Sequence, residues 1–277
     1  MSERTSGTGP TLPAGFHLHR FAAVGSTNDE AKALARAGAP GGTLVWADEQ
    51  TAGRGRRGRS WVSPPGNLYL SLLLRPDSEP ARAAQLGFVA ALGLADALAE
   101  LAGPALELRC KWPNDILANG WKLAGILLEA EAGAGGRVDF VIIGIGVNIA
   151  SAPARAEYPA TSLAAEGIAD VSPATLLAAF ARHFDRWHRR WCEAGFAPVR
   201  AAWLDRAVGL GEPVRVRLDR MTLDGRFADL DEDGALLLDT ADGRRRIAAG
   251  DVFPLTGAEA PGGHRDAPRS PPARSSA

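Results

Sequence analysis

The stretch KWPNDILANGWKLAGILLEAE (111–131) decides what kind of sheet this chain can form. The strand-like segment that ends at Lys111 is stopped by the following proline, which cannot donate to a sheet ladder. The next Asn-Asp pair favours a turn, and after a short loop Lys122 begins a second, apolar strand. The stretch therefore predicts a hairpin, with two ammonium groups and a carboxylate near one end of the sheet.

Other segments extend this hairpin into an α+β fold. The runs TLVWADE, NLYLSLLL and VDFVIIGIGVN predict further strands, and the last is too apolar for a solvated face. A long helix, apolar on most faces, is expected from Ala81. A second helical stretch (173–207) carries three packing residues, Trp187, Trp191 and Trp203. Strands joined by short loops, with the helices grouped apart, predict a mixed sheet flanked by helices.

Changes of texture divide the chain into four parts. Residues 1–13 and 257–277 are rich in Gly, Pro, Ser and Ala, and we expect both to be disordered. Residues 14–207 form the larger domain. Residues 208–256 alternate apolar and polar side chains between DG and DEDG turns, which predicts a small antiparallel β-barrel packed on that domain.

Composition excludes several classes of protein. Lys and Arg total 31 against 32 for Asp and Glu, so the chain lacks the basic excess of a dedicated nucleic-acid binder. Its two cysteines are too few and too far apart for a disulfide framework or a zinc site. The polar N-terminus is unlike a signal peptide, and no apolar run approaches the roughly 20 residues that span a bilayer. We expect a soluble protein in a reducing, cytoplasmic setting, with no membrane partner.

The basic residues gather locally in GRGRRGR (53–59). Glycines allow positive φ angles, so successive backbone N–H groups can converge on one anion. Arginines add planar forks that bind phosphate or carboxylate oxygens in pairs. Because four like charges repel one another, we expect the loop to be mobile until it closes over an anion. A solvated basic turn and an Arg-Gly nucleic-acid contact remain alternatives for this segment.

Three other segments carry polar residues where ligands can bind. Lys122 lies inside an otherwise apolar strand, which implies a carboxylate or phosphate partner. GIGVN (144–148) begins like a dinucleotide fingerprint but lacks the third glycine and the helix, so it predicts a strand that brings Asn148 to the sheet rim. GSTNDE (25–30) predicts a helix N-terminus, with a capping box between Thr27 and Glu30, and such a terminus also offers donors to a polar ligand.

Taken together and in this order, the motifs resemble the biotin protein ligases. The pattern is STN, a Gln before GRGRRGR and a Trp, then KWPND, KLAGIL and GIGVN, over about residues 20–165. The resemblance implies a biotin/lipoate ligase-like catalytic domain with a small C-terminal SH3-like β-barrel. It further implies that ATP and Mg²⁺ activate biotin as biotinyl-5′-AMP. The acyl group would then pass to one lysine of a carboxylase's biotin carboxyl carrier domain.

The resemblance also assigns residues to biotin. Four would hydrogen-bond its ureido ring: Ser26, Thr27, Asn28 and Gln50. Three residues of the basic loop would line biotin and the adenylate phosphate, namely Arg54, Gly55 and Arg56, and Arg59 would complete the clamp on the adenylate. Lys122 would hold the biotin carboxylate and later the acyl oxygen. These assignments place biotin between a helix N-terminus and the basic loop.

Further residues are assigned to the nucleotide and the acceptor. Lys111 and Asn114 would meet the nucleotide phosphates, and Asn148 would help to position the triphosphate and its Mg²⁺, with no carboxylate cage for the metal. Asp115 would orient the incoming lysine amine. Some relatives stack the adenine on a Trp that follows GIGVN. This loop has no Trp here, so Trp61 or Tyr158 would stack on the adenine instead. The chemistry would rest on four side chains, those of Lys122, Asp115, Lys111 and Arg56.

Two questions remain open after the resemblance. Relatives that act as repressors carry an N-terminal winged helix, but only 25 residues precede Ser26, so we expect no DNA binding. A lipoate ligase shares the fold and the adenylate chemistry, and a nucleic-acid-binding module is the rival from another class. A homodimer is compatible with the pattern, as is docking of the carrier by strand addition at an exposed sheet edge.

Overall fold

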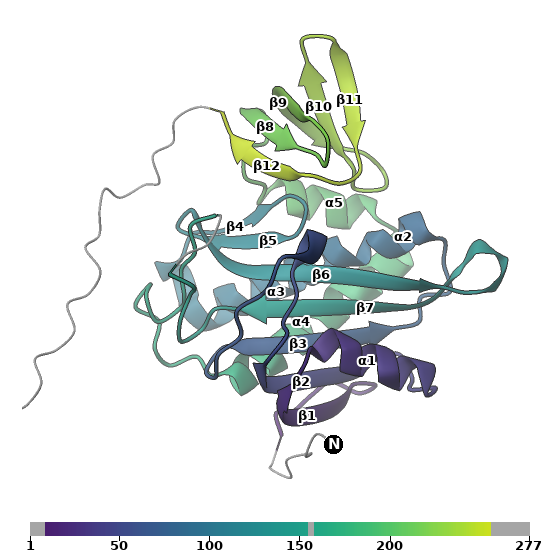
Figure 1. Cartoon of the computed structure of the whole chain (residues 1–277), viewed down its shortest axis with the longest axis vertical. Helices are drawn as coiled ribbons and strands as arrows, with labels where there is room; N and C mark the ends of the chain where they lie inside the picture. Colours follow the sequence, from purple (N-terminus) through teal and green to yellow (C-terminus); the bar gives the residue numbers. More distant parts are fainter. Residues whose placement is uncertain (1–8, 155–157, 256–277) are drawn as a thin grey trace, which may run out of the picture.

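The computed structural model describes residues 9–154 and 158–255. It contains a seven-stranded sheet with helices on both faces and a five-stranded sheet at one end, drawn at the top of Figure 1. Most of the expected disordered ends lie outside the described residues. Within residues 9–13, Leu12 packs against the core.

The larger sheet has the order β1-β2-β3-β7-β6-β5-β4. Its strands are β1 (His17–Val24), β2 (Thr43–Gln50), β3 (Leu68–Leu74), β4 (Leu108–Lys111), β5 (Asp115–Ala118), β6 (Trp121–Ala132) and β7 (Val138–Val147). β1 and β2 are parallel, and the other neighbouring pairs are antiparallel. This mixed sheet confirms the α+β class, although sequence analysis did not identify β1.

The stretch that begins at Lys111 forms two hairpins rather than one. Asp115, expected in a turn, begins β5, which pairs with β4 on one side and β6 on the other. The second turn is made by Asn119 and Gly120, with φ angles of 49° and 84°. An Asn-Gly pair with both φ angles positive is a preferred two-residue hairpin turn. The short loop expected before Lys122 was therefore wrong, because the Asn119-Gly120 pair was not recognised as a hairpin turn.

Helices cover the two faces of the larger sheet unequally. α1 (Thr27–Arg36) packs on one face with a small cluster that includes Phe21, Val45 and Phe140. α2 (Pro80–Ala84), α3 (Leu86–Ala102), α4 (Pro173–Ala194) and α5 (Ala197–Leu204) share the main core on the other face. Each expected long helix is interrupted once, at Gln85 and at Gly195, where φ is 71°.

The apolar helical segment Pro80–Ala102 corrects one expectation from sequence. By length and composition it could cross a membrane, whereas no such run was expected. Its side chains instead belong to the main core, where α3 packs against α4. The tryptophans at 187, 191 and 203 are buried in the same core, which confirms their packing role.

The C-terminal unit is an antiparallel sheet of order β11-β10-β9-β8-β12. Its strands are β8 (Pro213–Arg217), β9 (Thr222–Leu230), β10 (Leu236–Thr240), β11 (Gly243–Ile247) and β12 (Asp251–Pro254). β9 pairs its first half with β8 and its second half with β10, so the sheet coils. The expected closed barrel is not observed, because β11 and β12 do not pair within the described residues.

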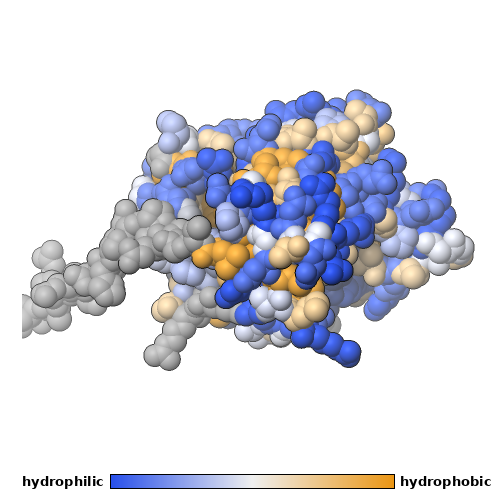
Figure 2. Space-filling view, turned by 90° about the horizontal axis from the view of Figure 1, so that it is seen from above, coloured by the Kyte–Doolittle hydropathy of each residue, from blue (hydrophilic) through white to orange (hydrophobic). Residues whose placement is uncertain are grey.

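The two units share one hydrophobic core. Phe88 of α3 packs edge-on against Phe196 and Trp203, with ring centroids 5.3 and 5.4 Å away. The Trp112 indole donates to the carbonyl of Gly234 in the C-terminal unit at 3.1 Å. Seen from above, the molecular surface is mostly hydrophilic, with hydrophobic residues in separate patches (Figure 2). The C-terminal sheet is thereby fixed beside the end of the larger sheet where the polar motifs meet.

Candidate active site

A cavity of about 540 Å³ lies between the larger sheet, the basic loop and the C-terminal sheet. Every residue that sequence analysis assigned to the site lines it: Ser26, Thr27, Asn28, Gln50, Arg54, Gly55, Arg56, Arg59, Trp61, Lys111, Asn114, Asp115, Lys122, Asn148 and Tyr158. Sequence analysis missed two lining residues of the C-terminal sheet, Asp251 and Phe253. Only the fold could reveal them, since they lie about 190 residues beyond the loop they face.

The N-terminus of α1 is held by side chains from the sheet. Ser26 is the N-cap residue but makes no side-chain cap bond, so the expected capping box between Thr27 and Glu30 is wrong. Instead, the amide and hydroxyl of Thr27 both donate to Gln50 Oε1, at 2.9 and 3.1 Å. These contacts fix the orientation of the Gln50 amide at the polar end of the cavity, where a ligand with both donors and acceptors can bind.

A buried serine supports the same end of the cavity. The Ser71 hydroxyl of β3, fully buried, lies 2.6 Å from Asn28 Oδ1 and 2.8 Å from Thr27 Oγ1. The Asn28 amide nitrogen donates to Glu129 at 2.6 Å, and Glu129 also pairs with Lys32 at 2.6 Å. The polar residues of α1 are thus preorganised by β3 and β6 rather than free at a helix end.

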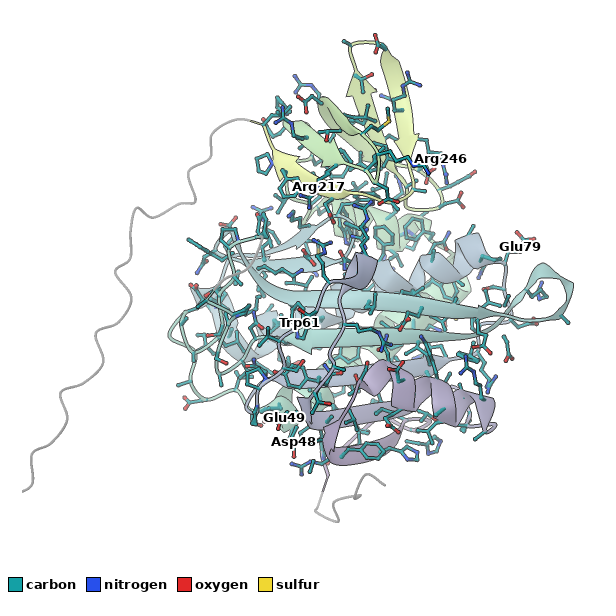
Figure 3. The ribbon with its side chains drawn as sticks, in the orientation of Figure 1. Asp48, Glu49, Trp61, Glu79, Arg217 and Arg246 are labelled. Carbon is teal, nitrogen blue, oxygen red and sulfur yellow. The ribbon has the colours of Figure 1, made fainter. Side chains whose placement is uncertain are left out.

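The glycines of GIGVN allow close packing against the sheet. A Cβ at Gly144 would lie 2.3 Å from Asn28 Oδ1, and one at Gly146 would lie 2.5 Å from the Trp61 indole. The Trp61 indole therefore lies close over Gly146 of β7 and Gly125 of β6, and Figure 3 shows Trp61 in front of these strands. Together with Gly125 of β6, these residues give the cavity an apolar wall. The glycines of this motif let side chains approach the strand closely, and they do not form a nucleotide-binding fingerprint.

The basic loop is folded as a small closed hairpin. Gly55 N–H donates to the Arg59 carbonyl at 2.7 Å, and Trp61 N–H donates to the Gly53 carbonyl at 2.9 Å. These amides bond within the loop, so they do not converge on one anion as expected. Arg54 turns away to form a bidentate ion pair with Asp29 on α1, which lowers the pKa of that carboxyl.

The other arginines of the loop face the C-terminal sheet. Arg56 donates to Asn114 Oδ1 at 3.0 Å and to the Gly250 carbonyl at 3.1 Å. Arg59 contacts the Asp251 carboxylate at 3.0 Å. Desolvation lowers the pKa of Arg56 from its ordinary value, while the nearby Asp251 charge opposes that change. In this structure the loop is folded around carboxylates of the protein itself, and its mobility stays a prediction.

Lys122 has the anionic partner that its place in an apolar strand predicted. Its Nζ lies 2.7 Å from Asp115 Oδ1, and both side chains are largely buried. The Trp61 ring centroid lies 5.5 Å from the same Nζ. The ammonium, the carboxylate and the apolar wall therefore meet at one point of the cavity. An anion that arrives there can take Lys122 as its counter-ion and displace Asp115 from it.

Lys111 occupies a more enclosed position. Its Nζ lies 3.5 Å from the centroid of Tyr158 and 5.2 Å from that of Phe253. Burial lowers the pKa of Lys111 to about 8, and the Asp115 charge partly opposes this change. A cation between two aromatic faces is stabilised by their quadrupoles. With its pKa near 8, Lys111 stays mostly charged at neutral pH and loses its proton in mildly alkaline solution.

Asn148 is buried at the rim of the sheet. Its side-chain nitrogen donates to the Thr161 carbonyl at 3.0 Å, which fixes the amide. The cavity's two carboxylates, from Asp115 and Asp251, are both paired with cations. Among residues 9–154 and 158–255 no group of three His, Cys, Asp or Glu side chains could hold a metal ion.

Sequence comparisons match both units of the chain. The profile of the Biotin/lipoate A/B protein ligase family matches residues 59–205, and that of the Biotin protein ligase C terminal domain matches residues 209–253. A biotin–[acetyl-CoA-carboxylase] ligase of Paracoccus denitrificans is 48% identical over 238 residues, which cover 84% of this chain and 98% of the relative. The chain belongs to the biotin protein ligase family. It is an enzyme of the biotin–[acetyl-CoA-carboxylase] ligase type.

Further relatives agree with this membership. The ligase is 38% identical to the bifunctional ligase/repressor BirA of Bacillus subtilis, over 86% of this chain and 74% of the relative. Its fold matches the Aquifex aeolicus biotin protein ligase in complex with biotin and ATP (TM-score 0.73, 30% identity, 86% of this chain and 97% of that one). It also matches the Leishmania major enzyme with biotinyl-5-AMP (TM-score 0.59, 30% identity, 86% of this chain and 100% of that one).

Proposed function

We propose that this ligase joins biotin to ATP as biotinyl-5′-AMP and then transfers the biotinyl group to one lysine of a biotin carboxyl carrier domain. One observation carries the proposal. The polar end at Gln50, the apolar wall at Trp61 and the cations Lys111, Lys122 and Arg56 all line one cavity. A molecule with a polar ring, an aliphatic chain and a carboxylate matches this order, and the cations beyond match a nucleotide phosphate.

Biotin binds between α1 and Lys122. Its ureido ring meets Ser26, Thr27 and Gln50, with Asn28 held behind them by Ser71 and Glu129. Its ring system and chain lie along the wall formed by Trp61 and the glycines of β6 and β7. Its carboxylate pairs with Lys122, which then no longer neutralises Asp115. The buried Ser71 contacts support this placement, because they hold the binding groups in position before the ligand arrives.

The nucleotide phosphates bind at the other end of the cavity. Arg56, Arg59, Lys111 and Asn114 supply the donors there, with Gly55 and Arg54 on the loop that borders biotin. Trp61 lies over Gly146 in the wall beside biotin, so Tyr158, which lies next to Lys111 at the phosphate end, is the candidate for stacking on adenine. Because both cavity carboxylates are paired, Mg²⁺ would have to come with ATP, and Asn148 would be the residue that helps to position it. The ion supplies additional positive charge to the triphosphate.

The first step is attack of the biotin carboxylate on the α-phosphorus, with pyrophosphate as the leaving group. Two anions must approach one another, and Lys122 and the arginines offset their repulsion. In the second step a neutral lysine amine attacks the acyl carbon, and AMP leaves. Lys122 stabilises the charge that develops on the acyl oxygen. Asp115, freed from Lys122, accepts the proton that the amine must lose.

We propose a cytoplasmic enzyme whose partner is the carrier domain, without a membrane or DNA partner. β1 is an edge strand of the larger sheet, and this position is compatible with a homodimer formed by strand addition. Light scattering of the purified protein tests this: a monomer at every concentration contradicts the dimer. A salt-dependent operator complex in a gel shift contradicts the absence of DNA binding.

Exchange of labelled pyrophosphate into ATP tests the adenylation step. Purified protein with Mg²⁺ is assayed with biotin, with lipoate and with neither acid. Exchange that requires biotin is expected. Exchange that requires lipoate would keep the mechanism but overturn the substrate. If folded protein shows no exchange with either acid, the enzyme proposal is overturned and a nucleic-acid contact by the basic loop is favoured. A binding titration with single-stranded RNA would then detect that contact.

A further inference from the structure

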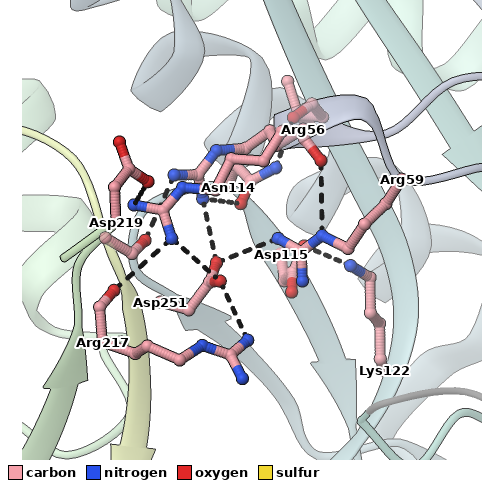
Figure 4. Close-up of polar contacts among 11 residues, drawn as sticks. Arg56, Arg59, Asn114, Asp115, Lys122, Arg217, Asp219 and Asp251 are labelled. Carbon is pink, nitrogen blue, oxygen red and sulfur yellow. Dashed lines mark hydrogen bonds and ion pairs between the residues drawn. The ribbon is translucent and has the colours of Figure 1, made fainter. Parts of the chain in front are cut away.

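One carboxylate of the C-terminal sheet lies within ion-pair distance of four arginines. Asp251, the first residue of β12, has a side chain that is only 12% exposed. Its oxygens lie 3.0 Å from Arg59, 3.3 Å from Arg217, 3.4 Å from Arg57 and 3.7 Å from Arg56 (Figure 4). Three of these arginines belong to the basic loop, and the fourth lies opposite Asp251 on β8.

Backbone groups of the same sheet add to the contact. The Gly250 carbonyl, next to Asp251, accepts from Arg56 at 3.1 Å. The Arg217 carbonyl accepts from Arg57 at 3.5 Å, and Asp219 in the turn after β8 pairs with Arg57 at 3.2 Å. The loop is therefore joined to the C-terminal sheet at several points. Of the two carboxylates in this contact, Asp251 is the more enclosed, because its side chain is 12% exposed and that of Asp219 is 82% exposed.

The loop needs such a counter-charge. Three guanidinium groups within four residues repel one another, and Arg57 holds a φ angle of 54°, which is unfavourable for a residue with a Cβ. The backbone hydrogen bonds within the loop, donated by Gly55, Arg59 and Trp61, close it as a hairpin but neutralise none of the guanidinium charges. Contacts with Asp251 must therefore supply much of what keeps the loop folded over the cavity before a nucleotide binds.

We propose that Asp251 is a positioning residue that holds the Arg56–Arg59 loop closed over the cavity and so retains the acyl-adenylate. Arg217 anchors the carboxylate from its own sheet, so it stays in place when phosphate arrives. A guanidinium carries five N–H donors, so Arg56 and Arg59 can bind Asp251 on one side and phosphate on the other. The closed loop keeps the mixed anhydride from escaping into water. This role rests on the proposed adenylation.

The test compares four forms of the full chain: wild type, Asp251→Asn, Asp251→Glu and the control Asp239→Asn. Asp239 lies in the same sheet and pairs with Arg244, away from the cavity. Biotinyl-5′-AMP is formed on the enzyme, and its release is followed by rapid gel filtration and by labelling of a bystander protein. Asp251→Asn is expected to release it roughly tenfold faster, the size of effect that loss of a charge-assisted hydrogen bond gives. Asp251→Glu and Asp239→Asn should stay close to wild type.

A second measurement tests the loop without substrate. Trypsin cleavage after Arg54 to Arg59, mapped by mass spectrometry, should be faster in Asp251→Asn than in the other three forms. Cleavage of the wild type should rise with salt, because salt screens the ion pairs, and that slope should be smaller in Asp251→Asn. Equal cleavage and equal release in Asp251→Asn and wild type would overturn the proposal, as would a Glu variant as leaky as the Asn variant. If wild type makes no adenylate, the proposed function fails while the cleavage result still decides the role of Asp251.

Discussion

Lys122 is the residue at which both half-reactions meet. Its ammonium pairs with Asp115 at 2.7 Å in this structure, and it is proposed to pair with biotin's carboxylate during adenylation. The Lys122→Ala variant should lose transition-state stabilisation, so that kcat/KM for carrier biotinylation falls about 10²- to 10³-fold. Arg244→Ala is the control, because Arg244 pairs with Asp239 on the C-terminal sheet and does not line the cavity. Near-normal turnover by the Lys122 variant would remove this residue from the mechanism.

Lys111 should make the use of ATP depend on pH. Burial lowers its pKa to about 8 from the ordinary 10.5, so the group is charged below pH 8 and loses its proton as the pH rises above it. We expect kcat/KM for ATP to fall as the pH passes from 7 to 9, since this parameter reports groups of the free enzyme. The Lys111→Met variant should have a low kcat/KM that changes little over this range. A wild-type profile as flat as that of the variant would contradict the assignment.

Strand β7 and the basic loop are coupled through Gly146. A Cβ at this position would lie 2.5 Å from the Trp61 indole. Gly146→Ala should therefore displace Trp61, raise the KM for biotin and lower the free energy of unfolding by about 1–3 kcal/mol. Gly87→Ala is the control, because its Cβ would meet only Leu128, at 4.0 Å. Pyrophosphate exchange and urea unfolding measure the two effects, and an unchanged KM for biotin would show that the wall does not contact the ligand.

The strands and helices that could be predicted from sequence are those with a strong local signal. β6 and β7 are long and apolar, and the helices were misjudged only where Gln85 and Gly195 interrupt them. β1 was missed because HLHRFAAV shows no clean alternation, and its parallel partner β2 lies 26 residues further on. The site residues were found through short motifs on the chain, and all of them line the cavity. Asp251, Ser71 and Glu129 carry no motif, so only the tertiary contacts identify them.

At the scale of the whole molecule, the two units should unfold together. Phe88 packs against Phe196 and Trp203, and its ring contacts the Gly234 turn of the C-terminal sheet. Phe88→Ala would leave a cavity at this junction and should lower the free energy of unfolding by about 3–5 kcal/mol. Circular dichroism and tryptophan fluorescence should give the same midpoint in wild type. Two separate transitions in the wild type would show that the shared core does not couple the units.

The chain contains only three lysines, Lys32, Lys111 and Lys122. Lys32 and Lys122 are paired with carboxylates, and Lys111 lies between two aromatic rings. Every other basic side chain among the 31 of Lys and Arg is a guanidinium, which stays protonated and is a poor nucleophile. An enzyme that makes an amine-reactive intermediate thus offers that intermediate few amines of its own. Self-inactivation is limited by composition, and any biotin recovered on the chain itself can be traced to these three side chains or the α-amino group.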